Sequence, residues 1–325
     1  MNSTTAVITI FIATFMWASW GQFLKRIGDW PLQAFMALLY GFSVVLTFVL
    51  LIISGGFGAL STLHKFTADN RLLLIYPLIG GFLFTTGMYY YMKSISTVGL
   101  ALTFMVFSAA SILVGTLSSA LAGGLPDDAP IPVVILGCLL VFSAVLISYF
   151  TQEKKENTQV AGTKVSKFAK IVLTAAVSGL LVSAYPFFMT LSMESPAMPI
   201  GLDTFQYMFL LSIGSLLAVI VVCIIPLAYK GELKKAFAGA TGFRVIAAAL
   251  SSVGHYGGNV VHGLAAPVVG MTISWPLGQT MALWGIMWGI IYGEYKGATK
   301  RAIAAIFLTI AVMAAGIALL TFSIY

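Results

Sequence analysis

The chain has 325 residues, of which 60% are hydrophobic and 8% are charged, and its formal net charge is +7. Soluble domains carry about 25% charged residues, so this composition excludes an ordinary water-soluble protein and indicates that lipid is the solvent. The positive charge does not indicate nucleic-acid binding, because the basic residues fall between the apolar stretches, where membrane proteins use them to fix orientation.

Apolar stretches follow one another along the whole chain, each close to the roughly 20 residues that cross the hydrocarbon as a helix. They cover 5–24, 32–54, 72–92, 98–122, 131–150, 168–192, 203–228, 243–263, 267–291 and 302–322. Helices are expected because lipid offers no partner for unpaired backbone groups. The predicted fold class is therefore an all-α polytopic membrane protein with ten transmembrane helices.

The longest polar segment, 151–167, separates two halves of five spans, 1–150 and 168–325. Short matches relate these halves: Gly87-Met88-Tyr89 in span 3 resembles Gly254-His255-Tyr256 in span 8, and Gly123 after span 4 pairs with Gly293 after span 9. Because five is odd, the second half begins on the opposite side of the membrane. The pattern predicts two inverted five-helix repeats, an arrangement typical of secondary transporters.

The basic residues also predict orientation. Of the 17 lysines and arginines, all except Lys65 and Arg71 lie in or beside the segments after spans 1, 3, 5, 7 and 9. By the positive-inside rule, that side faces the cytoplasm. We therefore expect a multi-pass protein of the cell membrane with 151–167 as a cytoplasmic linker and both termini outside the cytoplasm.

Span 8 carries the most unusual pattern. Ser252, His255, Asn259 and His262 recur at i, i+3, i+7 and i+10, which places them on one helix face. Polar side chains inside a bilayer face the bundle interior or a water-filled cavity. The pattern predicts a substrate-binding surface, with hydrogen bonding between helices as the alternative. Gly254 and Gly258 predict close helix packing beside it.

Span 9 repeats the spacing with Thr272, Trp275 and Gln279, and Pro276 predicts a kink there. An indole that stacks on a ring and an amide that binds hydroxyl groups favour a sugar site.

Other spans offer further candidates for the cavity wall. They are Trp17 in span 1, Tyr89 in span 3 and Tyr185 in span 6, where Pro186 predicts a second kink.

No carboxylate lies in the middle of any span. The candidates for proton coupling are therefore His255, whose reference pKa lies near 6.5, and the carboxylates of Glu194 and Asp203 at the outer mouth. Facilitated diffusion and exchange stay open. We expect no metal site and no cofactor. An enzyme is not predicted either, since no nucleophile is matched with a base and an orienting acid.

The junction of spans 9 and 10 reads Trp284-Gly285-Ile286-Met287-Trp288-Gly289, then Ile290-Ile291-Tyr292-Gly293-Glu294-Tyr295-Lys296-Gly297. With five plus five spans and a cytoplasmic linker, it resembles the drug/metabolite transporter superfamily. The junction is similar to that of its bacterial sugar-uptake branch, the glucose/ribose and L-rhamnose permeases. Plant ureide permeases end in a similar way. The resemblance implies proton-coupled uptake of a small polar metabolite.

The sequence thus predicts a secondary active transporter of a small polar metabolite, with a sugar as the first choice. A carrier of nucleobases, ureides or amphipathic metabolites, working as importer or exporter, is the alternative. A scaffold or receptor would have larger soluble loops and no polar stripe within a span. We expect membrane lipid, the solute and protons as partners, no nucleic acid, and either a monomer or a homodimer.

Overall fold

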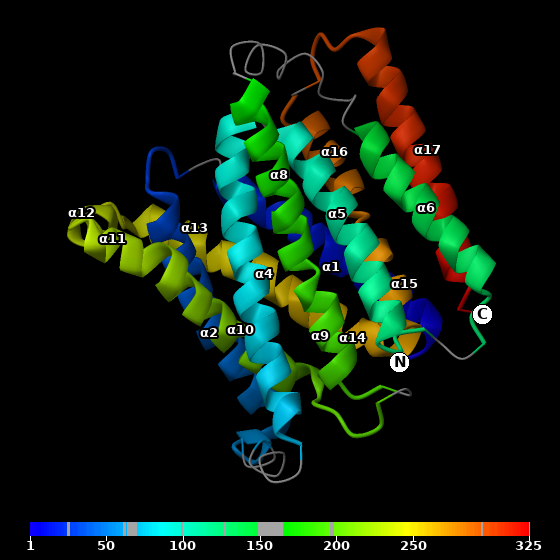
Figure 1. Ribbon diagram of the computed structural model, residues 1–325, viewed down its shortest axis with the longest axis horizontal. Helices are drawn as coiled ribbons and strands as arrows, with labels where there is room; N and C mark the ends of the chain where they lie inside the picture. Colours follow the sequence, from blue (N-terminus) through cyan, green and yellow to red (C-terminus); the bar gives the residue numbers. More distant parts are fainter. Residues whose placement is uncertain are drawn as a thin grey trace.

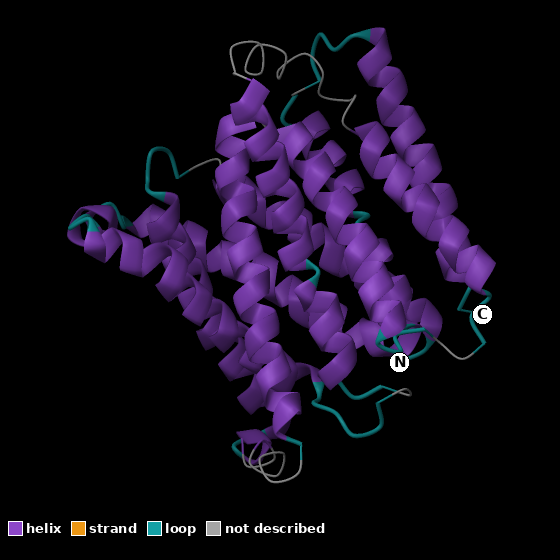
Figure 2. Ribbon diagram, in the orientation of Figure 1, coloured by secondary structure: helices purple, strands orange, loops and turns teal. Residues whose placement is uncertain are grey.

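The computed structural model describes residues 1–24, 27–60, 63, 70–98, 100–125, 128–148, 165–195, 198–293 and 295–324. Within these ranges the protein is a bundle of helices joined by short loops (Figures 1 and 2). The described residues form no strand; two isolated bridges, Met193 with Leu202 and Ser195 with Met198, close the loop between two helices. Residues 151–164 of the expected linker 151–167 lie outside the described residues.

In the described part of the first half of the chain, the long helices are α1 (Ser3–Leu24), α2 (Leu32–Gly55), α4 (Arg71–Val98), α5 (Leu100–Leu121) and α6 (Ile131–Ser148).

The helices of the second half are more often interrupted. They are α8 (Val165–Val182), α9 (Ala184–Ser192), α10 (Thr204–Val219), η2 (Ile220–Ile224), α11 (Ile225–Tyr229), α12 (Leu233–Ala238), α13 (Gly242–Ser252), η3 (Val253–Gly257), α14 (Gly258–Val269), α15 (Met271–Gly278), α16 (Met281–Ile291) and α17 (Lys300–Phe322). Both η elements are π-helical turns, which occur often at functional sites.

Among the described residues, 7 helical segments are long and apolar enough to cross a membrane. The protein is therefore all-α and compatible with a multi-pass membrane protein. The three remaining expected spans are also helical: α5 is continuous from Leu100 to Leu121, with Val106–Leu121 as its apolar portion, and the other two are less regular. The segment from α13 to α14 contains the polar residues of the predicted stripe, which lower its hydropathy, while α15 and α16 are separated by a turn.

The structure shows where the predicted interruptions and ends of spans 6, 8 and 9 fall. The helix of span 6 is interrupted at Ser183, just before Pro186, as expected. Span 8, expected to end at 263, continues to Val269, and Gly270 with φ 80° ends it. Pro276, where a kink is predicted, lies inside α15, and that helix ends two residues later at Gly278, before α16 begins at Met281.

The helices pack in a regular set of pairs (Figure 1). α1 packs against α13, η3, α14 and α16, while α4 packs against α8, α9 and α10. Further pairs are α2 with α10, α2 with α13, α5 with α8 and α9, α5 with α15, and α6 with α17.

Glycines allow the closest of these approaches. A Cβ added to Gly258 would lie 2.6 Å from Cδ1 of Trp17, and one added to Gly254 would lie 2.8 Å from Cβ of Trp20. The close packing predicted for these two glycines is confirmed, and the helix that packs against them is α1.

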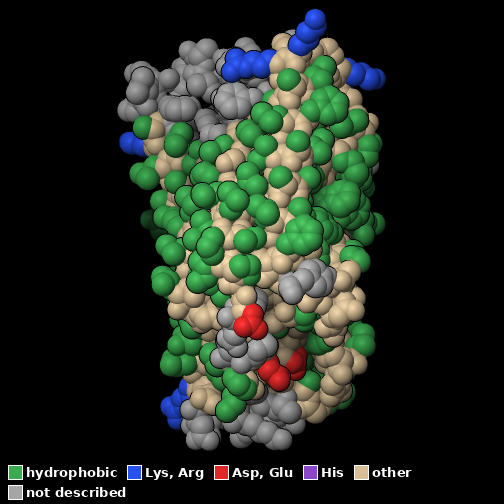
Figure 3. All heavy atoms as spheres, turned by 90° about the vertical axis from the view of Figure 1, so that its right-hand side faces the viewer, with side chains coloured by type: hydrophobic (Ala, Val, Ile, Leu, Met, Phe, Trp, Pro, Cys, Tyr) green, Lys and Arg blue, Asp and Glu red, His purple; other side chains and the backbone are tan. Residues whose placement is uncertain are grey.

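The surface seen in Figure 3 carries a broad band of hydrophobic side chains. Most of the Lys and Arg side chains on this face lie at one rim of the band, and the Asp and Glu side chains lie toward the opposite end. Both chain termini lie at that opposite end in Figure 1. Exposed apolar residues such as Ile53 (75% exposed) and Phe307 (69% exposed) would be costly in water.

Candidate functional site

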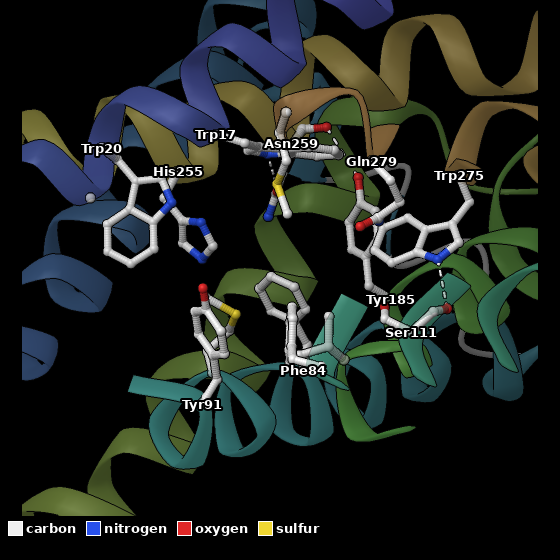
Figure 4. Close-up of a pocket in the computed structure, with 15 residues that line it drawn as sticks. Trp17, Trp20, Phe84, Tyr91, Ser111, Tyr185, His255, Asn259, Trp275 and Gln279 are labelled. Atoms are coloured by element: carbon white, nitrogen blue, oxygen red, sulfur yellow. Dashed lines mark hydrogen bonds between the residues drawn. The ribbon is translucent and has the colours of Figure 1, made fainter. Parts of the chain in front are cut away.

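A cavity of about 140 Å³ lies inside the helix bundle (Figure 4). Its lining residues come from α1, α4, α5, α8, α9, η3, α14, α15, α16 and the turn between the last two. Six of the residues predicted for the substrate site line it: Trp17, Tyr185, His255, Asn259, Trp275 and Gln279. The polar stripe of span 8 and the turn after α15 therefore meet in one place.

The amide of Asn259 is held in a fixed orientation. Nε1 of Trp17 donates a hydrogen bond to Oδ1 of Asn259 over 2.9 Å. Asn259 is 1% exposed, and its Nδ2 has no hydrogen-bond partner in the described structure. Because the indole occupies the oxygen, the amide presents its two N–H donors to the cavity.

Three other buried polar atoms on the cavity wall also have no partner within the described structure: Oε1 of Gln279, Nδ1 of His255 and Oγ of Ser111. Nε2 of His255 lies 3.3 Å from the hydroxyl of Tyr40, so only one of the two ring nitrogens is occupied. Unpartnered buried polar groups are rare because each costs desolvation free energy. A polar ligand in the cavity would supply partners for these four atoms.

Aromatic rings form the rest of the wall. The ring centres of Trp17, Tyr185 and Trp275 lie 5.7 to 6.5 Å apart. Nε1 of Trp275 donates to the carbonyl of Ser111 over 3.0 Å, which fixes that indole against α5. Figure 4 shows Phe84 and Tyr91 across the space from His255 and Asn259. A flat or ring-shaped solute would therefore contact aromatic faces and hydrogen-bonding groups together.

His262 lies behind this wall. Its Nδ1 is 3.1 Å from the hydroxyl of Tyr185, and its ring centre is 5.0 Å from that of Trp17. It does not line the cavity. His262 therefore holds two of the aromatic residues in place.

Three of the predicted substrate-binding residues do not line the cavity. Ser252 is buried against Ser43, and their hydroxyl oxygens are 3.0 Å apart. Ser252 therefore takes part in hydrogen bonding between helices, which was the alternative to a role in substrate binding. Thr272 is buried in α15 outside the cavity lining, and Tyr89 lies on another face of α4.

The two predicted carboxylates also lie elsewhere. Glu194 and Asp203 are exposed in and after the loop between α9 and α10. Asp203 is the N-cap of α10, where its carboxylate accepts from the backbone of Phe205 and Gln206. That bond satisfies helix-end donors, so Asp203 has a structural role in this conformation.

Several lining residues were not predicted from the sequence, among them Phe84, Met88 and Tyr91 on α4. Their spacing of i, i+4 and i+7 places them on one helix face, as in span 8. Apolar residues show this spacing in any packed helix, so it does not by itself indicate a cavity. Ser111 had no such signal, because its position depends on the contact between α5 and α15.

The cavity wall is uncharged: Asp, Glu, Lys and Arg are absent from the described residues that line it. A charged ligand would have to leave water without a counter-ion, which is expensive in a low-dielectric site. The arrangement therefore favours a neutral ligand with several hydrogen-bonding groups.

Comparisons with known proteins show the fold alone. No protein-family model matches this chain, and a search of curated proteins finds no match. One crystal structure of a protein superimposes with a TM-score of 0.66 at 12% sequence identity and covers 97% of this chain and 96% of that chain. The helical arrangement is thus one that a solved protein shares over nearly its whole length.

Proposed function

We propose that this chain is a secondary transporter built from two inverted five-helix repeats with its substrate site between them. Ten spans follow in chain order: α1, α2, α4, α5 and α6, then α8–α9, α10–α11, α13–α14, α15–α16 and α17. Numbered in this way, the most extensive contacts between spans come in matched pairs. Span 1 packs on span 8 as span 6 packs on span 3, and span 1 packs on span 9 as span 6 packs on span 4.

Further contacts follow the same rule. Span 2 packs on span 8 as span 7 packs on span 3, and spans 2 and 7, 4 and 9, and 5 and 10 pair with each other. The cavity lining comes from spans 1, 3 and 4 and from their counterparts 6, 8 and 9. Secondary transporters with inverted repeats bind substrate at such an interface.

Particular residues support the repeat as well. The matched Gly87 and Gly254 have equivalent neighbours: a Cβ on Gly87 would meet Val182 of span 6 at 2.9 Å, and one on Gly254 would meet Trp20 of span 1 at 2.8 Å. The matched Gly123 and Gly293 both follow a helix with positive φ, 91° and 68°.

The substrate that fits best is a small uncharged polar ring, with a monosaccharide as the first choice. The observation that carries this proposal is the set of four unpartnered polar atoms on an aromatic, uncharged wall. The volume of about 140 Å³ is close to the ~150 Å³ of an engineered protein cavity that holds one benzene molecule. A single ring therefore fits, and a drug-sized amphiphile does not fit in this conformation.

A nucleobase or ureide is the second candidate. Asn259 offers an amide donor and Gln279 an amide acceptor, and this pair matches the alternating groups on the edge of such a planar ring.

Thermal-shift measurements on the purified protein would distinguish these candidates. Monosaccharides, nucleobases, ureides and amino acids would each be added, because a specific ligand raises the unfolding temperature by mass action. A shift with one sugar class and none with its ring-opened alditol is the expected result. Stabilisation by charged amino acids alone would contradict the proposed neutral site.

Proton coupling through His255 is also part of the proposal, since it is the lining residue whose reference pKa is nearest neutral pH. Uptake into proteoliposomes with and without an imposed proton gradient would test this. If the wild-type protein ignores the gradient, the carrier is a uniporter or an exchanger, or it uses another ion.

The proposed location is the cell membrane with both termini outside the cytoplasm. Cysteines introduced at the termini should react with an impermeant thiol reagent in whole cells, and a cysteine near Lys234 should not. Labelling only near Lys234 would reverse the orientation.

A further inference from the structure

A second hollow lies at the end of the bundle that carries most of the basic residues. It is a groove of about 790 Å³ between α2, α4, η2 and α11. In Figure 1, α10 and α11 lean away from α4 toward this end. Tyr89 and Lys93 of α4 line the groove, whereas Met88 and Tyr91 line the central cavity, so α4 separates the two spaces.

The wall of the groove is divided by chemistry. One part is apolar and open to the surroundings of the bundle: it consists of Leu32, Val221, Val222 and Pro226, with Val221 47% exposed. The π-helical turn η2 contributes both valines. Hydrocarbon can therefore enter the groove from the side.

The other part is polar and basic. It carries Gln33, Tyr90, Lys93 and Lys230. Nζ of Lys93 lies 5.9 Å from the centre of the ring of Tyr89, which also lines the groove. Acidic side chains are absent from the described residues of its lining. The groove thus combines two cationic side chains with an apolar side wall.

We propose that this groove binds an anionic phospholipid, with the phosphate between Lys93 and Lys230 and an acyl chain along Val221 and Val222. A zwitterionic lipid would bring its own cation to the two lysines, and a free phosphate ester would make no use of the apolar wall. Basic pockets between transmembrane helices on the cytoplasmic side bind anionic head groups in this way. The proposal is independent of what the central cavity transports.

The experiment is lipid binding to the purified full-length protein, measured by native mass spectrometry. Phosphatidylglycerol and phosphatidylcholine with the same acyl chains would be titrated, with inorganic phosphate as a third ligand. The double variant Lys93→Gln/Lys230→Gln would be compared with Lys234→Gln/Lys235→Gln, which removes the same charge from α12, outside the groove lining. A third variant, Val221→Trp, fills the apolar wall without changing charge.

The wild-type protein and the α12 control should prefer phosphatidylglycerol. Each groove lysine should raise the affinity for phosphatidylglycerol about fivefold, which corresponds to about 1 kcal/mol for a basic residue near anionic lipid. The double variant should therefore bind this lipid about thirtyfold more weakly than the wild-type protein. Val221→Trp should weaken the binding of both lipids. This variant still tests the proposal if the double lysine variant does not fold.

Three results would overturn the proposal. Equal losses in the groove variant and the α12 control would mean general surface charge. Competition by inorganic phosphate at concentrations that match the lipid would mean a site for free phosphate esters. Unchanged lipid binding by Val221→Trp would mean that no acyl chain occupies the groove.

Discussion

Replacing Asn259 with alanine tests the central cavity most directly, because this side chain has two separate roles. Its Oδ1 accepts from Nε1 of Trp17 over 2.9 Å, and its unpartnered Nδ2 faces the cavity. Alanine removes the donors that a ligand would use and also leaves the part-buried indole N–H of Trp17 without an acceptor. We therefore expect losses in ligand affinity and in stability.

The two losses can be estimated separately. A neutral hydrogen bond contributes about 0.5–1.5 kcal/mol, so losing one or two donors should weaken ligand binding by about 2- to 150-fold. A buried donor left unsatisfied costs about 1–3 kcal/mol of folding free energy. Trp17 is only half-buried, which favours the lower end of this range because water can reach part of the indole.

A double-mutant cycle separates these roles. Asn259→Ala, Trp17→Phe and the double variant would be compared by ligand titration and by chemical unfolding in detergent. If the Trp17–Asn259 bond is formed, the two stability changes should be non-additive by about 1 kcal/mol. The control is Trp17→Phe alone, which should keep more affinity than Asn259→Ala because the amide donors remain.

Strictly additive stability changes would refute the bond between the indole and the amide. Unchanged affinity in the folded fraction of Asn259→Ala would refute its role in the site and make it a packing residue.

Three further changes test neighbouring features. Gln279→Leu should lower ligand affinity about 2- to 13-fold by removing one acceptor, while Thr272→Val, a buried position outside the cavity lining, should leave titrations unchanged. His255→Gln should flatten the pH dependence of proteoliposome uptake between about pH 5 and 8, whereas Asp203→Ala should lower stability by about 1 kcal/mol through the lost N-cap and leave that profile unchanged. Gly258→Ala should destabilise by about 1–3 kcal/mol through overpacking, measured by chemical unfolding.

Much of the cavity could be predicted from spacing alone. Helical periodicity places His255 and Asn259 on one face, and the bilayer makes such a face turn inward. The same reasoning found Trp275 and Gln279 on the next span. These are local regularities, and the physical penalty for polar groups in lipid makes them reliable.

Other features depend on contacts between distant segments. The role of Ser111 follows from its carbonyl receiving the Trp275 indole, 164 residues away. No local pattern indicates this contact, so the sequence predicts the inward face but not its complete lining.

The link between Trp17 and Asn259 joins recognition to helix packing. The indole that orients the amide also lies where Gly258 has no side chain, with its Cδ1 2.6 Å from the position of a Cβ. The same ring stands 6.4 Å from the ring of Trp275 and 6.5 Å from that of Tyr185. A shift of α1 against α14 would therefore move the amide donors and the aromatic wall together. A ligand changes a conformational equilibrium only through different affinities for the two states, and in the proposed carrier this shared indole is the part through which such a difference would arise.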